Sequence, residues 1–301
     1  MRAKLTAYFD HDGKLPLTDR IALAKHHGIN AIGLRSYQDR PLIEMSDRDA
    51  KDVYQLFRQV DMNLSFLDAG IGNYDLNSDA QFKDQLEAFK FLIELSDRLK
   101  TNILCLRLPR FTKVIDEYEN IATRLTPFIE AAGKRRKRIW LIMSNDYKAN
   151  TYAYILKKIK AQHVDILFDP VYFLNLHQST TTAYRLLKKY IGAFCCHDQD
   201  QHGSPRLLGY GKTDVINLFK KLTRDRYHGY LMVDNRFYQQ IFSETKTKKG
   251  FFGFGQKKAQ KQKDALQKEL SHVLFPNEQT RICTYDDVLA NQIRLVKVLF
   301  S

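Results

Sequence analysis

The chain has 301 residues, of which 44% are hydrophobic and 12% aromatic, and its formal net charge is +14. This length fits one large α/β barrel or two ordinary domains, and the apolar content argues against global disorder. No run of about 18 apolar residues occurs, so we expect no transmembrane helix. The N-terminus is too short in its apolar part for a secretory signal, and we therefore expect a cytoplasmic protein.

The positive charge permits binding of nucleic acid or of anionic ligands, but a basic surface without such a role is the simpler interpretation. It is concentrated in residues 134–138, just before an apolar segment, and in a lysine-rich tract over residues 246–268. The four cysteines are spaced neither as a disulfide framework nor as a zinc ribbon, so we expect reduced thiols.

Eight apolar segments, each expected to form a strand, alternate along the chain with segments of helical period. The strands are predicted at residues 4–10, 29–35, 62–67, 102–108, 138–143, 166–169, 193–198 and 230–234. Strict alternation predicts an α/β fold, a (β/α)8 TIM barrel. Two further helices are predicted at about 257–274 and 285–300, and the last could close the barrel or form a homodimer. We expect a single domain over residues 1–301, with the barrel at about 3–275.

The last three predicted strands each end in polar or acidic residues. These are Asp169, the run Cys195-Cys-His-Asp198, and Asp234. Because the chemistry of such barrels lies where the strands end, the three ends are the first place to look for a site.

Motifs along the chain, in order, resemble those of one known family. Gly28-Ile-Asn-Ala-Ile-Gly-Leu-Arg35 is similar to "GikyiELR", Leu167-Phe-Asp-Pro-Val-Tyr-Phe173 to "fDPaNF", Cys195-Cys-His-Asp198 to "HvKD", and Gly229-Tyr-Leu-Met-Val-Asp234 to "GflslE". These motifs are typical of the sugar phosphate isomerase/epimerase family, the xylose-isomerase-like barrels. The resemblance runs from residue 5 to about residue 237 and implies the TIM barrel fold.

The resemblance also implies a divalent metal held by Glu, Asp, His and Glu at the ends of strands five to eight. The matching positions here are Ser144, Asp169, Cys195 and Asp234, so that both glutamates and the histidine are replaced. Cys195 favours a softer ion such as Zn²⁺ over Mn²⁺. Three outcomes stay open: Zn²⁺ bound through Asp169, Cys195 and Asp234 with help from His197 or Asp198, activity without metal, or no activity.

An isomerase or epimerase of this kind needs a base beside the carbon next to a carbonyl group. By resemblance, the catalytic candidates are Asp234, Asp169 and His197. The candidates for substrate binding are Asp10, Arg35, Arg107, Asn145, Asp198 and Lys212. For the two arginines, an ion pair with an acidic loop residue is an equal alternative, and for residues 197–202 a solvated polar loop is the alternative.

Three functions follow from these features. The first is a barrel that binds or acts on a small sugar or polyol phosphate, with an altered metal site. The second is a non-catalytic sugar sensor or partner-binding barrel. The third, an abasic-site nuclease of the endonuclease IV type, would suit the charge but not the residues at the strand ends. The basic run at 134–138 would also lie at the opposite end of the barrel, which argues against nucleic acid at the site.

Overall fold

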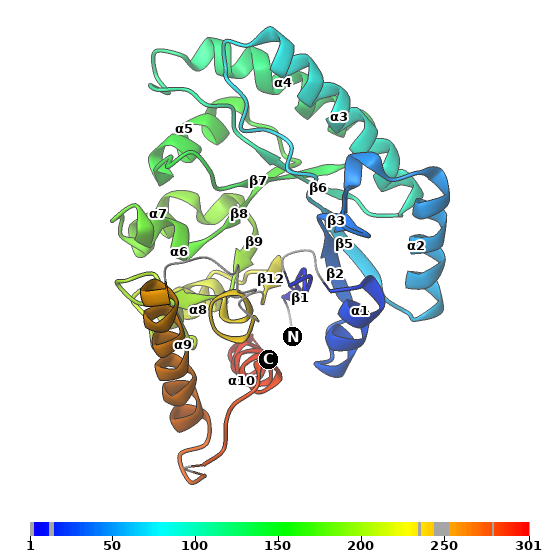
Figure 1. The fold of residues 1–301 in the computed structure, drawn as a ribbon. Helices are drawn as coiled ribbons and strands as arrows, with labels where there is room; N and C mark the ends of the chain where they lie inside the picture. Colours follow the sequence, from blue (N-terminus) through cyan, green and yellow to red (C-terminus); the bar gives the residue numbers. More distant parts are fainter. Residues whose placement is uncertain (1–2, 12–14, 234–235, 244–252, 279, 301) are drawn as a thin grey trace.

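Eight parallel strands form one sheet that curls into a ring, with the helices outside it (Figure 1). The computed structural model describes every residue except 1–2, 12–14, 234–235, 244–252, 279 and 301. In sheet order, the strands are β1 (Lys4–Thr6), β12 (Tyr230–Met232), β9 (Ile191–Cys195), β8 (Val164–Phe168), β7 (Arg138–Ile142), β6 (Ile103–Arg107), β5 (Asn63–Leu67) and β2 (Ala31–Leu34). Short antiparallel pairs β3 (Ser36–Tyr37) with β4 (Arg40–Pro41), and β10 (Asp198–Gln199) with β11 (Pro205–Arg206), lie in the loops.

The helices alternate with these strands as the sequence predicts. They are α1 (Leu17–His26), α2 (Asp47–Gln59), α3 (Asp79–Arg98), α4 (Tyr118–Lys134), α5 (Ala149–Ile159), α6 (Pro170–Asn175), α7 (Thr180–Leu187), α8 (Val215–Arg224), α9 (Gly253–Leu274) and α10 (Tyr285–Phe300). Short helical turns lie at η1 (Leu42–Glu44), η2 (Lys188–Tyr190) and η3 (Tyr238–Phe242). The predicted TIM barrel with extra C-terminal helices is therefore confirmed, although α6 was not anticipated as a separate helix.

The ring closes between its first two strands with little strand pairing. β1 is only three residues long, and the backbone N–H of Gly33 donates to the carbonyl of Ala7 at 2.9 Å across the gap. Outside this seam, α10 packs against α8 through Phe300 and Phe219, whose rings meet edge to face, and it reaches α1 through Lys297. The last helix thus covers the closure of the ring, which is one of the two roles that its sequence permits.

Aromatic side chains fill the interior of the ring. Phe66 on β5 lies 5.1 Å from Tyr8 and 5.2 Å from Trp140 on β7, measured between ring centroids. Gly33 on β2 makes room for them, because a Cβ atom there would lie 2.3 Å from the Phe66 ring. The glutamate that the resembled family carries at this position has no space in this barrel.

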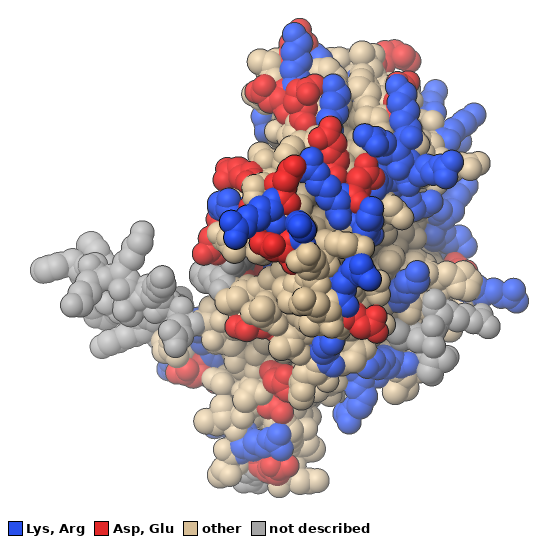
Figure 2. Space-filling model, turned by 90° about the vertical axis from the view of Figure 1, so that its right-hand side faces the viewer, with Lys and Arg blue, Asp and Glu red and all other residues tan. Residues whose placement is uncertain are grey.

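Basic side chains gather at the end of the barrel where the strands begin. The run 134–138 spans the end of α4 and the start of β7, and its residues 134–137 border a shallow surface hollow together with Lys100. Lysine and arginine side chains gather densely on the upper part of the face in Figure 2. The prediction that this run lies away from the C-terminal ends of the strands is confirmed.

Among the described residues, no helix has the length and apolar character required to cross a bilayer.

Candidate functional site

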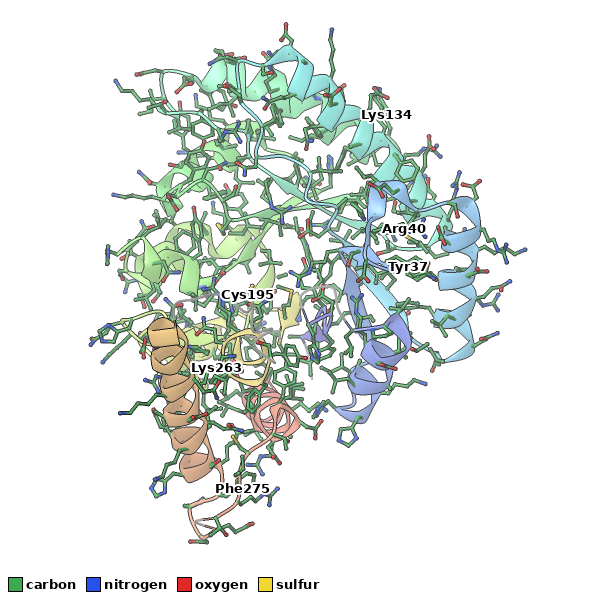
Figure 3. All side chains as sticks on the ribbon, viewed as in Figure 1. Tyr37, Arg40, Lys134, Cys195, Lys263 and Phe275 are labelled. Atoms are coloured by element: carbon green, nitrogen blue, oxygen red, sulfur yellow. The ribbon has the colours of Figure 1, made fainter. Side chains whose placement is uncertain are left out.

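A pocket of ≈ 370 Å³ opens where the barrel strands end, close to Cys195 in the middle of the ring (Figure 3). Three kinds of side chain line it. The floor is apolar and includes Ile142, Leu167 and Met232. The walls carry charged residues from both sides of the ring, and aromatic residues cover part of the mouth. Of the predicted site residues, the pocket brings together Asp10, Arg35, Arg107, Asp169, Cys195 and His197.

Asp169 and His197 form a hydrogen-bonded pair in one wall. The Nε2 atom of His197 lies 2.6 Å from Oδ1 of Asp169. The same oxygen accepts from the backbone N–H groups of Val171 at 2.8 Å and Tyr172 at 3.1 Å, because Asp169 is the N-cap of α6. Burial alone would raise the pKa of Asp169, but the neighbouring His197 and the N–H of Tyr172 outweigh it and lower that pKa. The carboxylate is therefore held charged and in place.

Cys195 adds a third donor to this wall. A carboxylate oxygen of Asp169, the Sγ atom of Cys195 and a ring nitrogen of His197 lie within 4.8 Å of one another. One thiol, one imidazole and one carboxylate form a donor set suited to Zn²⁺, whereas Mg²⁺ and Mn²⁺ prefer oxygen ligands. Of Zn²⁺ and Mn²⁺, the two ions considered from the sequence, these three residues fit Zn²⁺, which is the softer ion.

The opposite wall holds an ion pair between Asp68 and Arg107. The guanidinium donates to both carboxylate oxygens, at 2.7 and 2.9 Å, and the Tyr8 hydroxyl donates to Oδ2 at 3.0 Å. Burial would raise the pKa of Asp68, but the hydrogen bonds and charge of Arg107 lower it. Burial, followed by the charge of Asp68, raises the pKa of Tyr8 well above its usual value. Asp68 was not among the residues predicted for the site.

Arg35 and Asp10 form a second bidentate pair beside the first. Nη2 of Arg35 donates to Oδ1 of Asp10 at 2.6 Å, Nε donates to Oδ2, and the guanidinium lies 4.8 Å from the centre of the Tyr8 ring. Both predicted arginines therefore face the pocket while paired with an acid. These contacts match the alternative that each arginine forms an ion pair with an acid. The two acids, Asp10 and Asp68, also line the pocket.

The mouth of the pocket includes residues that sequence reasoning missed. Arg236, Tyr238 and Gln239 follow β12, and Tyr285 begins α10. The His11 ring stacks on Tyr238, with ring centroids 3.6 Å apart. The charge of Arg236 contributes to the lowered pKa of Asp169. The only sequence signal for Arg236 is a cation four residues after the end of β12, whereas Tyr285 comes from a helix far along the chain.

Several predicted residues lie outside the pocket lining. The carboxylate of Asp198 is buried and accepts from the N–H groups of Gly209, Gly211 and Thr213 at 2.9–3.1 Å, and from the Thr213 hydroxyl at 2.7 Å. It orders the loop at residues 209–213, and the predicted substrate-binding residue Lys212 in that loop is exposed. These hydrogen bonds satisfy the Asp198 carboxylate without a bound substrate.

The residues after β7 are also turned to structural contacts. The side-chain amide of Asn145 donates to the Leu108 carbonyl at 3.1 Å, and the Ser144 carbonyl accepts from the Tyr172 hydroxyl at 2.8 Å. Ile142, two residues before Ser144, lines the pocket instead. Asp234, predicted as both a ligand and a base, lies outside the described residues.

Comparisons with known proteins agree with this architecture. The D-psicose 3-epimerase with D-tagatose from Clostridium cellulolyticum H10 superposes with a TM-score of 0.69 at 11% identity, covering 99% of each chain. L-ribulose 3-epimerase gives 0.67 at 14% identity, over 99% of this chain and 94% of its own. The IOLI protein with a zinc atom gives 0.66 at 14% identity, over 87% and 96%. At such identities the likeness establishes the fold alone.

The sequence comparisons are more specific. No match was found among curated protein sequences. Residues 21–251, however, match the model of a family described as the xylose isomerase-like TIM barrel. This match spans most of the chain and includes every strand of the ring except β1. The chain therefore belongs to the xylose isomerase-like TIM barrel family.

Proposed function

We propose that this protein binds a small sugar or polyol, in free or phosphorylated form, in the pocket and acts on it as an isomerase or epimerase. The observation that carries the proposal is the His197–Asp169 pair, which lies beside Cys195 and faces carboxylates held by arginines. Such an arrangement combines a proton-exchanging group with fixed polar groups in a pocket small enough for a single sugar.

His197 is the proposed base. Histidine is the side chain that most often serves in general acid–base catalysis, which suits proton removal next to a carbonyl group. Since Nε2 faces Asp169, Nδ1 is the nitrogen that exchanges a proton with the substrate, and Asp169 stabilises the imidazolium that forms. Asp234 keeps its predicted role as the second carboxylate of the proton transfer.

The opposite wall orients the substrate. A carboxylate can accept about four hydrogen bonds. Asp10 accepts two from Arg35 and can also accept from a sugar hydroxyl group. Asp68 already accepts from Arg107, Tyr8 and the backbone N–H of Gly70, and so it holds Arg107 in place. Arg236 at the mouth offers a cation for a phosphate or another anionic group. Because Gly209 and Gly211 donate to Asp198, we place any phosphate near Arg236 instead of near that loop.

A metal ion would lie against the other wall. Asp169, Cys195 and His197 are the residues that would hold Zn²⁺. When bound there, such an ion would polarise the carbonyl group of the substrate. One nitrogen of His197 cannot both bind a metal ion and accept a proton from the substrate. Metal binding and proton transfer would therefore have to use different nitrogens of the ring.

The test is deuterium exchange from D2O into a panel of ketoses, aldoses and their phosphates, followed by NMR. We expect exchange next to the carbonyl carbon of one substrate, reduced about 100-fold or more in His197→Gln. His202→Ala is the matched control, because His202 is an exposed histidine of the same loop, and it should retain full exchange. If no member of the panel binds, the proposal is wrong.

A non-catalytic sugar-binding barrel is the second candidate. It is favoured by the apolar Ile142 in the pocket floor, because β7, which ends at this residue, offers no acid to a substrate there. The same panel separates the two functions. Binding detected by thermal shift without any deuterium exchange supports the sensor, whereas exchange supports the enzyme.

A further inference from the structure

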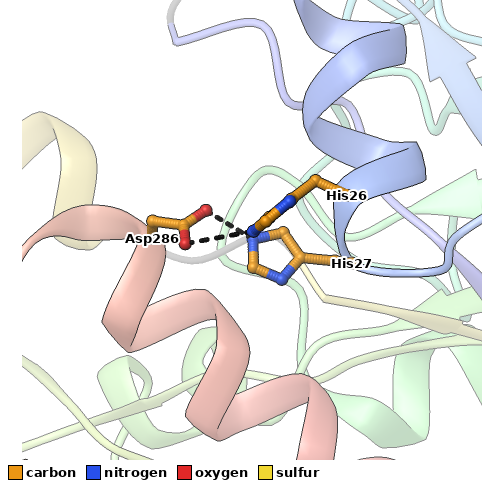
Figure 4. A group of neighbouring side chains, drawn as sticks. All are labelled: His26, His27 and Asp286. Atoms are coloured by element: carbon orange, nitrogen blue, oxygen red, sulfur yellow. Dashed lines mark hydrogen bonds and ion pairs between the residues drawn. The ribbon is translucent and has the colours of Figure 1, made fainter.

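A second group of metal-ligating side chains lies outside the barrel, between the first helix and the last. His26 is the last residue of α1, His27 is its C-cap, and Asp286 lies in the first turn of α10 (Figure 4). The Nε2 atom of His27 is 2.9 Å from Oδ1 of Asp286, and that of His26 is 3.4 Å from Oδ2. Each of the two neighbouring imidazoles thus directs its Nε2 atom at the Asp286 carboxylate.

The spacing of these atoms is close to that of a metal's ligands. Nitrogen and oxygen ligands lie about 2.0–2.1 Å from Zn²⁺, so in a tetrahedral site they are roughly 3.3 Å from one another. The donor atoms of His26, His27 and Asp286 all lie within 4.8 Å of one another, and the two N···O distances lie near this value. Small rotations of the side chains would bring all three onto one ion.

The surroundings allow an ion to enter and to be held. The side chains of His26 and Asp286 are 67% and 49% exposed, whereas that of His27 is only 5% exposed. One ligand is therefore anchored in the core, and the other two leave a side of the site open to water. The carbonyl end of α1 favours a cation, and the N–H end of α10 favours the Asp286 carboxylate.

A simple hydrogen bond between His27 and Asp286 would explain only part of this arrangement. His27 alone would tie α1 to α10, and Lys297 already adds a second tie by donating to the His27 carbonyl at 2.9 Å. An exposed histidine beside an acid contributes little stability, so the tie does not require His26. The positive charge of Lys297 lowers the affinity of the site for a cation, because the two charges repel each other.

We propose that His26, His27 and Asp286 form a binding site for Zn²⁺ or a similar transition-metal ion. Two imidazoles and one carboxylate are ligands that such ions prefer, whereas Ca²⁺ and Mg²⁺ prefer oxygen ligands alone. The ion joins the first and last helices across the seam where β1 and β2 are not paired along their lengths. Its binding therefore stabilises the closure of the barrel, and it does so independently of any reaction in the pocket.

The experiment is a Zn²⁺ titration of the metal-stripped full chain, followed by calorimetry and thermal unfolding. It is carried out in a Cys195→Ala background, so that the pocket donors do not dominate. We expect one bound ion and a rise of the unfolding midpoint of about 5 °C at 100-fold excess over Kd. His26→Ala and Asp286→Asn should each weaken this binding about tenfold or more.

Matched controls separate this site from binding elsewhere. His272→Ala removes an exposed histidine of α9 and should leave the titration unchanged. Co²⁺ provides a spectroscopic check, because a site without thiolate gives weak bands and no sulfur charge-transfer band. The proposal is overturned if Zn²⁺ leaves the unfolding midpoint unchanged, or if His26→Ala and His272→Ala titrate alike.

Discussion

The two walls of the pocket hold their carboxylates in opposite ways. On one wall, Asp10 and Asp68 face Arg35 and Arg107 through bidentate pairs. On the other, Asp169 faces His197 and lies beside Cys195. A guanidinium remains protonated at every pH a protein meets, whereas imidazole and thiol groups exchange protons and bind metals. The first wall is therefore built to stay fixed and the second to react.

Removing the cation from the fixed wall should have the largest effect on stability. Arg107→Met leaves the buried Asp68 carboxylate without its counter-ion, and we expect a loss of about 3–5 kcal/mol in the free energy of unfolding. Urea denaturation measures it. The control is Lys90→Met, which breaks an exposed pair with Glu87 and should cost about 0.5 kcal/mol or less. Equal losses in the two variants would show that burial does not distinguish these pairs.

The same variant should reverse the pH dependence contributed by Asp68. In the natural chain the pKa of Asp68 is lowered by Arg107, so its stabilising contribution is present above the ordinary carboxyl pKa of about 4. That contribution is lost as the pH falls through the lowered pKa. Without Arg107, burial raises the pKa of Asp68, and the penalty present at neutral pH is relieved on acidification. The stability gap between the two proteins should therefore narrow as the pH falls.

The reactive wall can be tested by its cysteine. Cys195→Ala should weaken Zn²⁺ binding in the pocket by about 100-fold or more, since structural and catalytic zinc sites depend on each ligand. Cys196→Ala is the control: the neighbouring thiol is equally buried but packs in the outer core, and burial raises its pKa. A Co²⁺ titration should show a thiolate charge-transfer band in the control and none in Cys195→Ala. A band that survives in Cys195→Ala would mean that another thiol binds the metal.

The sequence predicts the fold better than it predicts the walls. Apolar segments and helical periods depend on neighbouring residues, and all eight strands lie where they were expected. The partnership of Asp68 with Arg107 joins residues from two strands, and no local pattern encodes it. Asp169 was recognised as a site residue, but Asp-Pro is also an N-cap followed by proline at N1, which could have predicted α6.

Asp198 shows the opposite error of sequence reasoning. It follows a strand, as substrate-binding residues of this family do, yet its carboxylate is occupied by the loop at residues 209–213. A side chain on Gly211 would collide with it, since a Cβ atom there would lie 2.1 Å from Oδ1 of Asp198. Resemblance places an acid at a strand end, but only the folded loop determines whether that acid faces the pocket.

The smallest expected effect comes from Gly33, and it tests whether the two walls are independent. Gly33→Ala drives a methyl group against Phe66, which lies under Tyr8, so we expect a loss of about 1–3 kcal/mol and a weaker Tyr8–Asp68 contact. In a double-mutant cycle with Phe66→Leu, most of this loss should be recovered. The Zn²⁺ titration of the cysteine wall should not change, because Asp169 and His197 follow β8 and β9, which are not neighbours of β2 or β5 in the sheet. A shift of that titration equal to the shift in stability would mean that the interior packing joins both walls into one unit.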